Sequence, residues 1–294
     1  MSTVVAVPAP AKVNLFLRVL ERRPDGYHEI DTLFQAISLA DEVHVELGGS
    51  GIRLEVDGPD LGPVVDNLAF RAAESLADAA GWTGGVRIGL AKRIPAGAGL
   101  GGGSSDAAAV LRALSTALDF GDRKRLLRIA AELGSDVPFF LGGSALARGG
   151  GRGEILDSLD ALPAAELVVV SPPVHVSTAV AYRTLSERRE PGVRRSPVRP
   201  LDWAPDSWEE VTSVAWNDFQ PLVCGTHPEV GRALEALETV GAGTALMSGS
   251  GSSVFGIFGG REEAEDAADR LRSTLGWPCV AARTLDDLPE VAVG

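Results

Sequence analysis

The sequence contains only two cysteines among its 294 residues, and no run of apolar residues approaches the roughly 20 that a membrane-spanning helix needs. Cys224 and Cys279 lie far apart and form no Cys-x-x-Cys pair, so neither a disulfide framework nor a zinc site is expected. The first residues lack a basic segment followed by a long apolar one, so no export signal is expected. A reducing, cytoplasmic location fits these absences best.

Positive charge is also scarce, because 40 acidic residues face 27 basic ones and the net charge is −13. Binding to DNA, RNA or anionic membranes draws on Lys and Arg, so neither nucleic acid nor membrane is expected as a partner. The 45% apolar and 23% charged residues are typical of a folded globular protein. Only three basic residues are lysines, Lys12, Lys92 and Lys124, so a retained lysine is a candidate for a role that a guanidinium cannot fill.

Apolar runs at 13–19, 30–39, 42–47 and 52–56 predict the strands of one sheet. Between the first two runs, Pro-Asp-Gly predicts a hairpin or tight loop that joins antiparallel strands. Asp66 is the predicted N-cap of a helix from about Asn67 to Ala80.

A predicted strand at 86–90 leads into a glycine-rich loop and then a capped helix that runs to about Leu118. Five of the seven residues from 97 to 103 are glycine, and Ser-Ser-Asp follows them. Glycines allow close approach of the backbone, and the N–H groups at a helix start bind anions, so the loop predicts a phosphate site. It lacks the lysine of a Walker loop.

The sequence of this loop allows two other interpretations. Gly97, Gly99 and Gly102 match G-x-G-x-x-G, with Asp119 about twenty residues later, as in a dinucleotide site. Asp119 would end a helix that another helix follows, where a dinucleotide-binding unit needs a strand, so a phosphate loop is favoured. A plain glycine-rich connector is the remaining alternative.

The second half of the chain also mixes strands and helices, and the boundary between two domains, 1–155 and 156–294, is expected near a glycine cluster at 148–153. Strands are expected at 167–170, 254–258 and 279–284, helices at 123–133, 178–185, 228–240 and 261–275, and a surface loop at 188–205. This order without βαβ regularity predicts an α+β fold.

Three ordered motifs resemble those of the GHMP kinase superfamily: Pro10-Ala-Lys-Val-Asn-Leu, the glycine loop from Pro95, and Ser248-Gly-Ser-Gly-Ser-Ser. The resemblance implies a two-domain GHMP kinase fold, with an N-terminal half like domain 2 of ribosomal protein S5 and a ferredoxin-like C-terminal half. The active site is then expected between the halves. Asn217-Asp218 resembles a structural segment of the family.

Arg23-Pro-Asp-Gly-Tyr-His, Thr32-Leu-Phe-Gln and Gly134-Ser-Asp-Val-Pro-Phe-Phe are similar to one branch of these kinases, which acts on a cytidylyl polyol. The branch implies ATP-dependent phosphorylation of the 2-hydroxyl of an erythritol moiety in non-mevalonate isoprenoid biosynthesis, by a monomer or homodimer. The alternatives are a GHMP kinase with another alcohol acceptor, a binding module without catalysis and a dinucleotide-dependent oxidoreductase.

The resemblance implies that Asp136 and Lys12 form the catalytic pair. A carboxylate can accept the proton of a substrate hydroxyl, and an ammonium can hold that carboxylate ionised and offset charge on the transferred phosphoryl group. The alternatives are a plain N-cap for Asp136, ahead of Pro138, and a solvated lysine for Lys12.

The expected substrate-binding residues are Asn14, Tyr27, His28, Phe34 and Tyr182. A tyrosine ring can stack on cytosine and an imidazole can bond its edge, while Tyr182 aligns with the aromatic residue that closes the other face of the base in the family. A strand-end polar residue is the alternative for Asn14, a core residue for Phe34 and a helix-face residue for Tyr182.

The phosphate loop implied for ATP comprises Pro95, Ala96, Gly97, Ala98, Gly99, Leu100, Gly101, Gly102, Gly103, Ser104 and Ser105. Asn67 and Lys92 are further candidates near the nucleotide. Ser105 is the candidate ligand of Mg²⁺, because a hydroxyl with phosphate oxygens and water is a usual magnesium shell. Asp106 stands where many relatives have Asn, and its carboxylate either binds the metal or faces away.

Overall fold

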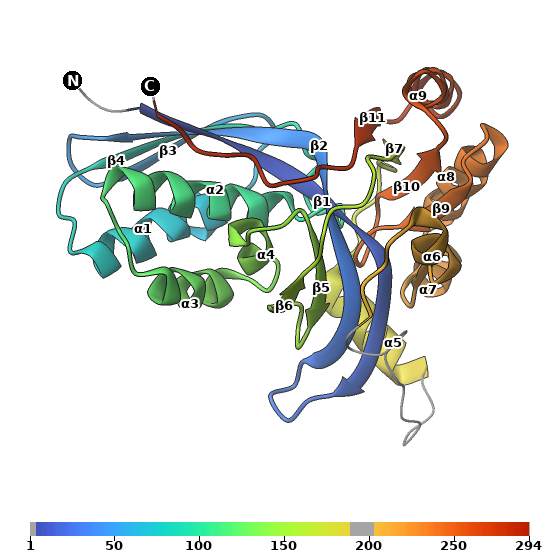
Figure 1. The fold of residues 1–294 in the computed structure, drawn as a ribbon, viewed down its shortest axis with the longest axis horizontal. Helices are drawn as coiled ribbons and strands as arrows, with labels where there is room; N and C mark the ends of the chain where they lie inside the picture. Colours follow the sequence, from blue (N-terminus) through green and yellow to red (C-terminus); the bar gives the residue numbers. More distant parts are fainter. Residues whose placement is uncertain (1–3, 189–202, 294) are drawn as a thin grey trace.

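The computed structural model describes residues 4–188 and 203–293 and folds them into two β-sheets flanked by helices (Figure 1). The first sheet contains β1 (Val4–Arg22), β2 (His28–Leu47), β3 (Ile52–Asp57), β4 (Val86–Ala91), β5 (Leu146–Gly150), β6 (Ile155–Ser158), β8 (Trp216–Asn217) and β12 (Ala292–Val293). The second contains β7 (Glu166–Val170), β9 (Thr244–Met247), β10 (Val254–Phe258) and β11 (Cys279–Arg283). The helices are α1 (Leu68–Ala80), α2 (Gly102–Ala117), α3 (Arg123–Leu133), α4 (Val137–Leu141), α5 (Thr178–Arg188), α6 (Trp208–Ser213), α7 (Gln220–Thr226), α8 (Pro228–Thr239) and α9 (Arg261–Leu275), with a 3-10 turn η1 at Val64–Asp66.

The long hairpin of β1 and β2 forms the centre of the first sheet, and it confirms the antiparallel pair predicted from sequence. In Figure 1 its tip extends beyond the other strands of the first sheet. The tip is closed by a bond of 2.7 Å from the Arg23 N–H to the Tyr27 carbonyl. The prediction of two separate strands at 30–39 and 42–47 is wrong, because β2 runs through both without a break. The register with β1 shifts at a bulge opposite Pro10 and Ala11, and the pairing continues on both sides of it.

Helices α1 to α4 cover one face of the first sheet, while α8 and α9 pack on the second (Figure 1). Alternate residues of β7 are buried on opposite faces. Val168 and Val170 face the core under α8 and α9, whereas Leu167 and Val169 face a cluster with Phe16 of β1. Burial on both faces explains why β7 is apolar throughout, and the shared cluster joins the two halves of the molecule.

The expected α+β fold is confirmed. After residue 156 the chain forms all four strands of the second sheet, but β8 and β12 return to pair with β1. The boundary between 1–155 and 156–294 stays a prediction. The described helices include none that is long and apolar enough to cross a membrane. Most of the loop expected at 188–205, residues 189–202, lies outside the described residues.

Two predicted helix caps are wrong. Asp66 ends the turn η1, and Asn67 caps α1 by accepting a bond of 2.9 Å from the Ala69 N–H. Helix α2 begins at Gly102, earlier than the serines suggested, because Gly101 takes a left-handed conformation at φ 72°. Ser104 and Ser105 therefore lie inside its first turn, and no side chain caps the helix.

Candidate active site

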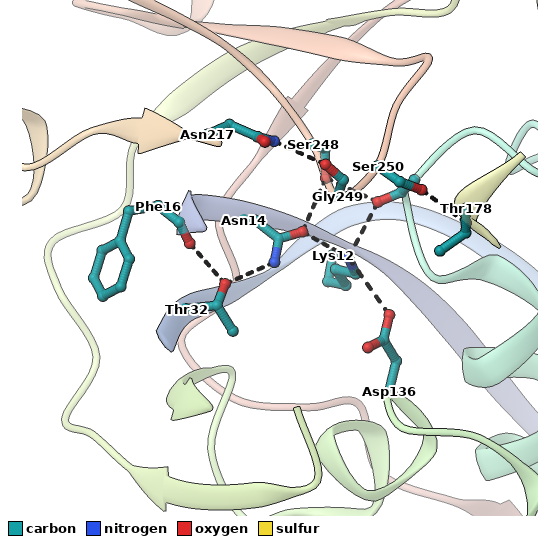
Figure 2. Close-up of polar contacts among 11 residues, drawn as sticks. Lys12, Asn14, Phe16, Thr32, Asp136, Thr178, Asn217, Ser248, Gly249 and Ser250 are labelled. Atoms are coloured by element: carbon teal, nitrogen blue, oxygen red, sulfur yellow. Dashed lines mark hydrogen bonds and ion pairs between the residues drawn. The ribbon is translucent and has the colours of Figure 1, made fainter. Parts of the chain in front are cut away.

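Two glycine loops from distant parts of the chain lie against each other beside the start of α2. A Cβ on Gly99 would lie 2.2 Å from the Ser248 carbonyl oxygen, and φ at Gly99 is +81°. The Ser248 hydroxyl donates a bond of 2.9 Å to the Gly99 carbonyl. Asn217 holds the second loop in place, since its amide donates 2.8 Å to the Gly249 carbonyl (Figure 2) and 2.7 Å to the Met247 carbonyl. Asn217 therefore has the structural role expected of it.

Lys12 and Asn14 point to the same side of β1, as expected for residues two apart on a strand. Both are buried, and the Lys12 Nζ donates bonds of 2.7 Å to Asn14 Oδ1 and 3.1 Å to the Gly99 carbonyl (Figure 2). The Asn14 amide donates 2.8 Å to Thr32 Oγ1. Lys12 is not the solvated lysine of the alternative interpretation, and it links β1 to the glycine-rich loop.

Asp136 occupies the N-cap of the short helix α4 but makes no side-chain capping bond. Its Oδ2 instead lies 3.5 Å from the Lys12 Nζ, with the two side chains 30% and 4% exposed (Figure 2). One partner is therefore fixed inside the protein, while the other remains open to a ligand. The alternative of a plain N-cap for Asp136 does not describe this arrangement.

A cavity of about 320 Å³ opens in front of this ion pair. Lys12, Asn14 and Asp136 line it together with Gly97, Gly99 and Gly101 of the glycine loop. The first N–H groups of a helix lack partners within the helix and attract anions. The cavity therefore combines glycine backbone next to a helix start, an ammonium and a partly exposed carboxylate.

A second cavity of about 890 Å³ adjoins the first and is lined by Tyr27, His28 and Tyr182. The His28 ring stacks on Tyr182 with centroids 5.3 Å apart, and its Nε2 lies 2.8 Å from the Ser186 hydroxyl. Tyr27 is 56% exposed at the hairpin tip. The residues expected to hold a base are therefore together, on β2, α5 and the loop between β1 and β2.

Phe34 is a core residue that also borders one of the cavities, and its expected role in substrate binding stays a prediction. Its side chain is 1% exposed and packs against Phe139 in the core. It also lines the smaller cavity, and the Lys12 Nζ lies 5.4 Å from its ring centroid. The face of the Phe34 ring thus lies against the Lys12 ammonium, at a distance typical of a cation–π contact.

Asn67 and Lys92 lie outside the residues that line these two cavities, so their expected roles near the nucleotide stay predictions. Asn67 caps α1. The Lys92 ammonium is buried between the carboxylates of Asp41 and Asp106, with its Nζ 2.7 Å from Asp106 Oδ2. Although burial alone lowers it, these two carboxylates raise the pKa of Lys92 above its ordinary value.

The carboxyl group of Asp106 is strongly perturbed by the same cluster. Burial raises the pKa of Asp106 to about 7, Lys92 opposes this rise, and the nearby Asp41 carboxylate adds to it. Asp41 Oδ1 also accepts bonds from the N–H groups of Arg93 and Ile94. The cluster therefore joins the segment before the glycine loop to the N-terminal part of α2.

Sequence reasoning missed several residues that line the cavities, above all Arg152 and Thr178, which line both of them. His175, beside Gly97, lines the smaller one. Arg152 belongs to the glycine cluster that was interpreted only as a domain boundary. An arginine enclosed by glycines was the available signal, because such a turn brings a charged side chain close to neighbouring backbone.

Comparisons with known proteins agree with this geometry. Residues 67–144 match the family GHMP kinases N terminal domain, and residues 206–276 match GHMP kinases C terminal. The chain is 42% identical to the 4-diphosphocytidyl-2-C-methyl-D-erythritol kinase of Geobacter sp. (strain M21), over 94% of this chain and 98% of that protein. The enzyme of the same name from Citrifermentans bemidjiense is also 42% identical, over 94% and 98% of the two chains.

Solved structures give the same result. A crystal structure of 4-(cytidine 5'-diphospho)-2C-methyl-D-erythritol kinase matches with a TM-score of 0.77 and 41% identity, covering 95% of this chain and 98% of the other. Homoserine kinase from Cytophaga hutchinsonii matches with a TM-score of 0.67 at 19% identity, covering 99% and 97% of the two chains. At that identity the likeness is one of fold alone.

Proposed function

The chain belongs to the 4-diphosphocytidyl-2-C-methyl-D-erythritol kinase family of the GHMP kinases, and we propose that Lys12 and Asp136 carry out its reaction. That reaction is the ATP-dependent phosphorylation of the 2-hydroxyl of 4-diphosphocytidyl-2-C-methyl-D-erythritol. The reaction belongs to the methylerythritol phosphate route to isoprenoids. One observation carries the assignment of these residues. The carboxylate and the ammonium face each other in the cavity that also contains the glycines of the phosphate loop.

Asp136 is the general base in this proposal. Its carboxylate accepts the proton of the 2-hydroxyl while the new O–P bond forms and the bond to the ADP oxygen breaks. Lys12 keeps the carboxylate ionised and oriented, and its positive charge offsets the charge that spreads over the transferred phosphoryl group. Asn14 and the Gly99 carbonyl hold the ammonium in place for both tasks.

We assign the phosphates of ATP to the segment from Pro95 to Ser105 and the start of α2, where free N–H groups and the helix dipole favour anions. Mg²⁺ fits the same turn. The Ser105 hydroxyl is buried and lies outside the residues that line the two cavities, but it has no hydrogen-bond partner within the described residues, which favours it as a ligand. Bound Mg²⁺ would neutralise phosphate charge there. Asp106 has one unpartnered oxygen beside it, but its other oxygen is bonded to Lys92.

We assign the cytosine ring to the larger cavity, where Tyr27 and Tyr182 offer aromatic faces and His28 offers a hydrogen-bonding edge. The two cavities adjoin, so a base in the larger one and a hydroxyl at Asp136 fit the two ends of one extended molecule. Asn14, in the smaller cavity, is then positioned to bond the polyol.

The test is ADP release by the purified protein with ATP, Mg²⁺ and 4-diphosphocytidyl-2-C-methyl-D-erythritol, with homoserine and mevalonate as control acceptors. Turnover confined to the cytidylyl substrate is the expected result. Turnover with a control alcohol alone would keep the kinase chemistry and discard the cytosine pocket. Omitting Mg²⁺, and comparing Ser105→Ala with the parent protein over a series of Mg²⁺ concentrations, tests the metal assignment.

A further inference from the structure

Arg152 stands at the tip of a tightly fixed turn between β5 and β6. On one side of the turn, the Gly151 N–H donates 2.7 Å to Glu29 Oε1, and the Gly151 carbonyl accepts 2.8 Å from the Ile30 N–H. On the other side, the Arg152 N–H donates 2.6 Å to Glu154 Oε2. The backbone that carries Arg152 is therefore held in place before any ligand binds.

The same turn lies directly beside the proposed base. A Cβ on Gly153 would come within 3.7 Å of Asp136 Oδ1 and within 3.5 Å of the Phe34 ring. Gly153 has φ +114° and Gly151 has φ +65°, conformations that glycine adopts readily. The two glycines thus let the turn fold tightly and bring its Gly153 end close to Asp136.

The guanidinium of Arg152 is placed for contact with a ligand. It lies 4.7 Å from the centroid of the Tyr27 ring, and the side chain is 28% exposed. Its Nε is 3.6 Å from Glu154 Oε1, which is longer than a hydrogen bond. The planar fork of N–H donors is well matched to phosphate oxygens.

The substrate of the proposed function has a base at one end, a reactive polyol at the other and a diphosphate between them. Four described residues line both cavities, namely Asp136, Arg152, Thr178 and Tyr182, and Arg152 is the one with positive charge. A molecule with its base near Tyr27 and its hydroxyl at Asp136 must carry its diphosphate past this point. Two further arginines, Arg22 and Arg183, line the larger cavity but not the smaller one.

We propose that Arg152 binds the diphosphate bridge of the substrate and so aligns the polyol with Asp136. The inference rests on the proposed function, because it takes the base and the hydroxyl to occupy the two cavities. Contact with a phosphate through charge-assisted hydrogen bonds contributes roughly 10-fold or more to affinity. Contact with Tyr27 alone would not distinguish a nucleoside from its diphosphate.

The experiment measures the binding of cytidine and of CDP by titration calorimetry to the parent protein, Arg152→Gln and Arg183→Gln. Arg183→Gln is the matched variant, since it removes an arginine that lines the larger cavity alone. The expected result is that Arg152→Gln weakens CDP binding by roughly 10-fold while cytidine binding changes less than about 2-fold. Arg183→Gln should weaken CDP binding by a smaller factor.

Two results would overturn the inference and leave the proposed function intact. Equal weakening of cytidine and CDP by Arg152→Gln would mean that Arg152 acts only by supporting Tyr27. Equal loss of CDP affinity in both variants would mean that the general charge of the cavity, and no specific contact, attracts the diphosphate. If the parent protein bound neither cytidine nor CDP, the cytosine pocket and the inference would both be wrong.

Discussion

The Asp136 carboxylate lies 3.5 Å from the Lys12 ammonium although its backbone occupies the N-cap of α4. Asp122 provides the contrast within the same chain. It caps α3 in the ordinary way, with its Oδ1 accepting a bond of 2.9 Å from the Arg125 N–H. Two aspartates at equivalent helix positions therefore direct their carboxylates differently, one to the helix and the other into a cavity.

This contrast allows a direct test of the proposed base. Asp136→Asn should lower kcat by about 100-fold or more, because a general base contributes roughly 10²–10⁴-fold, while ATP binding stays within about 2-fold of the parent value. Asp122→Ala should leave kcat unchanged and lower the free energy of unfolding by about 1 kcal/mol, the usual loss for an N-cap. Steady-state kinetics and thermal unfolding of both variants test whether Asp136 acts in catalysis and Asp122 only in stability. Near-normal turnover by Asp136→Asn would show that Asp136 is not the base.

The two tyrosines of the chain, Tyr27 and Tyr182, both line the larger cavity. A protein labelled with ¹³C in its tyrosine rings therefore gives only two sets of ring signals, and both should shift on addition of CDP. Tyr27→Ala should raise the KM for the cytidylyl substrate about 10-fold, since stacking on a base contributes roughly 1–3 kcal/mol, and should leave the KM for ATP nearly unchanged. Equal rises in both KM values would argue against stacking by Tyr27.

Local sequence signals predicted much of the fold. Alternating apolar residues and Pro-Asp-Gly located the β1–β2 hairpin, and α9 begins and ends at the predicted residues. The strand at 254–258 also has its predicted bounds. These features depend on neighbouring residues, so a single sequence contains them. The cap of α1 was missed because Asp66 and the adjacent Asn67 are equally good caps by residue type.

The parts that the sequence could not supply depend on pairing between distant segments. The turn that carries Arg152 lies beside Asp136 because β5 pairs with β2, with Gly149 opposite Thr32. No local pattern specifies that register. Lys92 was expected near ATP from the resemblance, but its two carboxylate partners come from β2 and α2. Long-range packing decides such partners, and residue spacing contains little information about them.

The contact between the two glycine loops should make Gly99 intolerant of substitution. In Gly99→Ala the new methyl group would meet the Ser248 carbonyl at 2.2 Å, and a left-handed backbone costs an alanine about 1–2 kcal/mol before that clash is counted. We expect a lower melting temperature and a higher KM for ATP. The control is Gly231→Ala within α8, where the nearest atom is 3.9 Å away and the gain in helix propensity is about 1 kcal/mol. Equal melting temperatures for the two variants would contradict close packing of the loops.

The buried Asp106 should make stability depend on pH in an unusual direction for a carboxyl group. Its pKa in the folded protein is raised to about 7 from an ordinary value of 3.8, so the folded state holds a proton that the unfolded state releases between these values. Stability from this group is fully present below about pH 4 and is lost as the pH rises through 7. Asp106→Asn removes the titration but keeps a side chain of the same shape. The unfolding free energy of the parent protein, minus that of Asp106→Asn, should therefore fall between pH 5 and pH 8, as measured by urea unfolding in buffers of equal ionic strength. A difference that stays constant over this range would mean that the Lys92 ammonium keeps Asp106 ionised throughout.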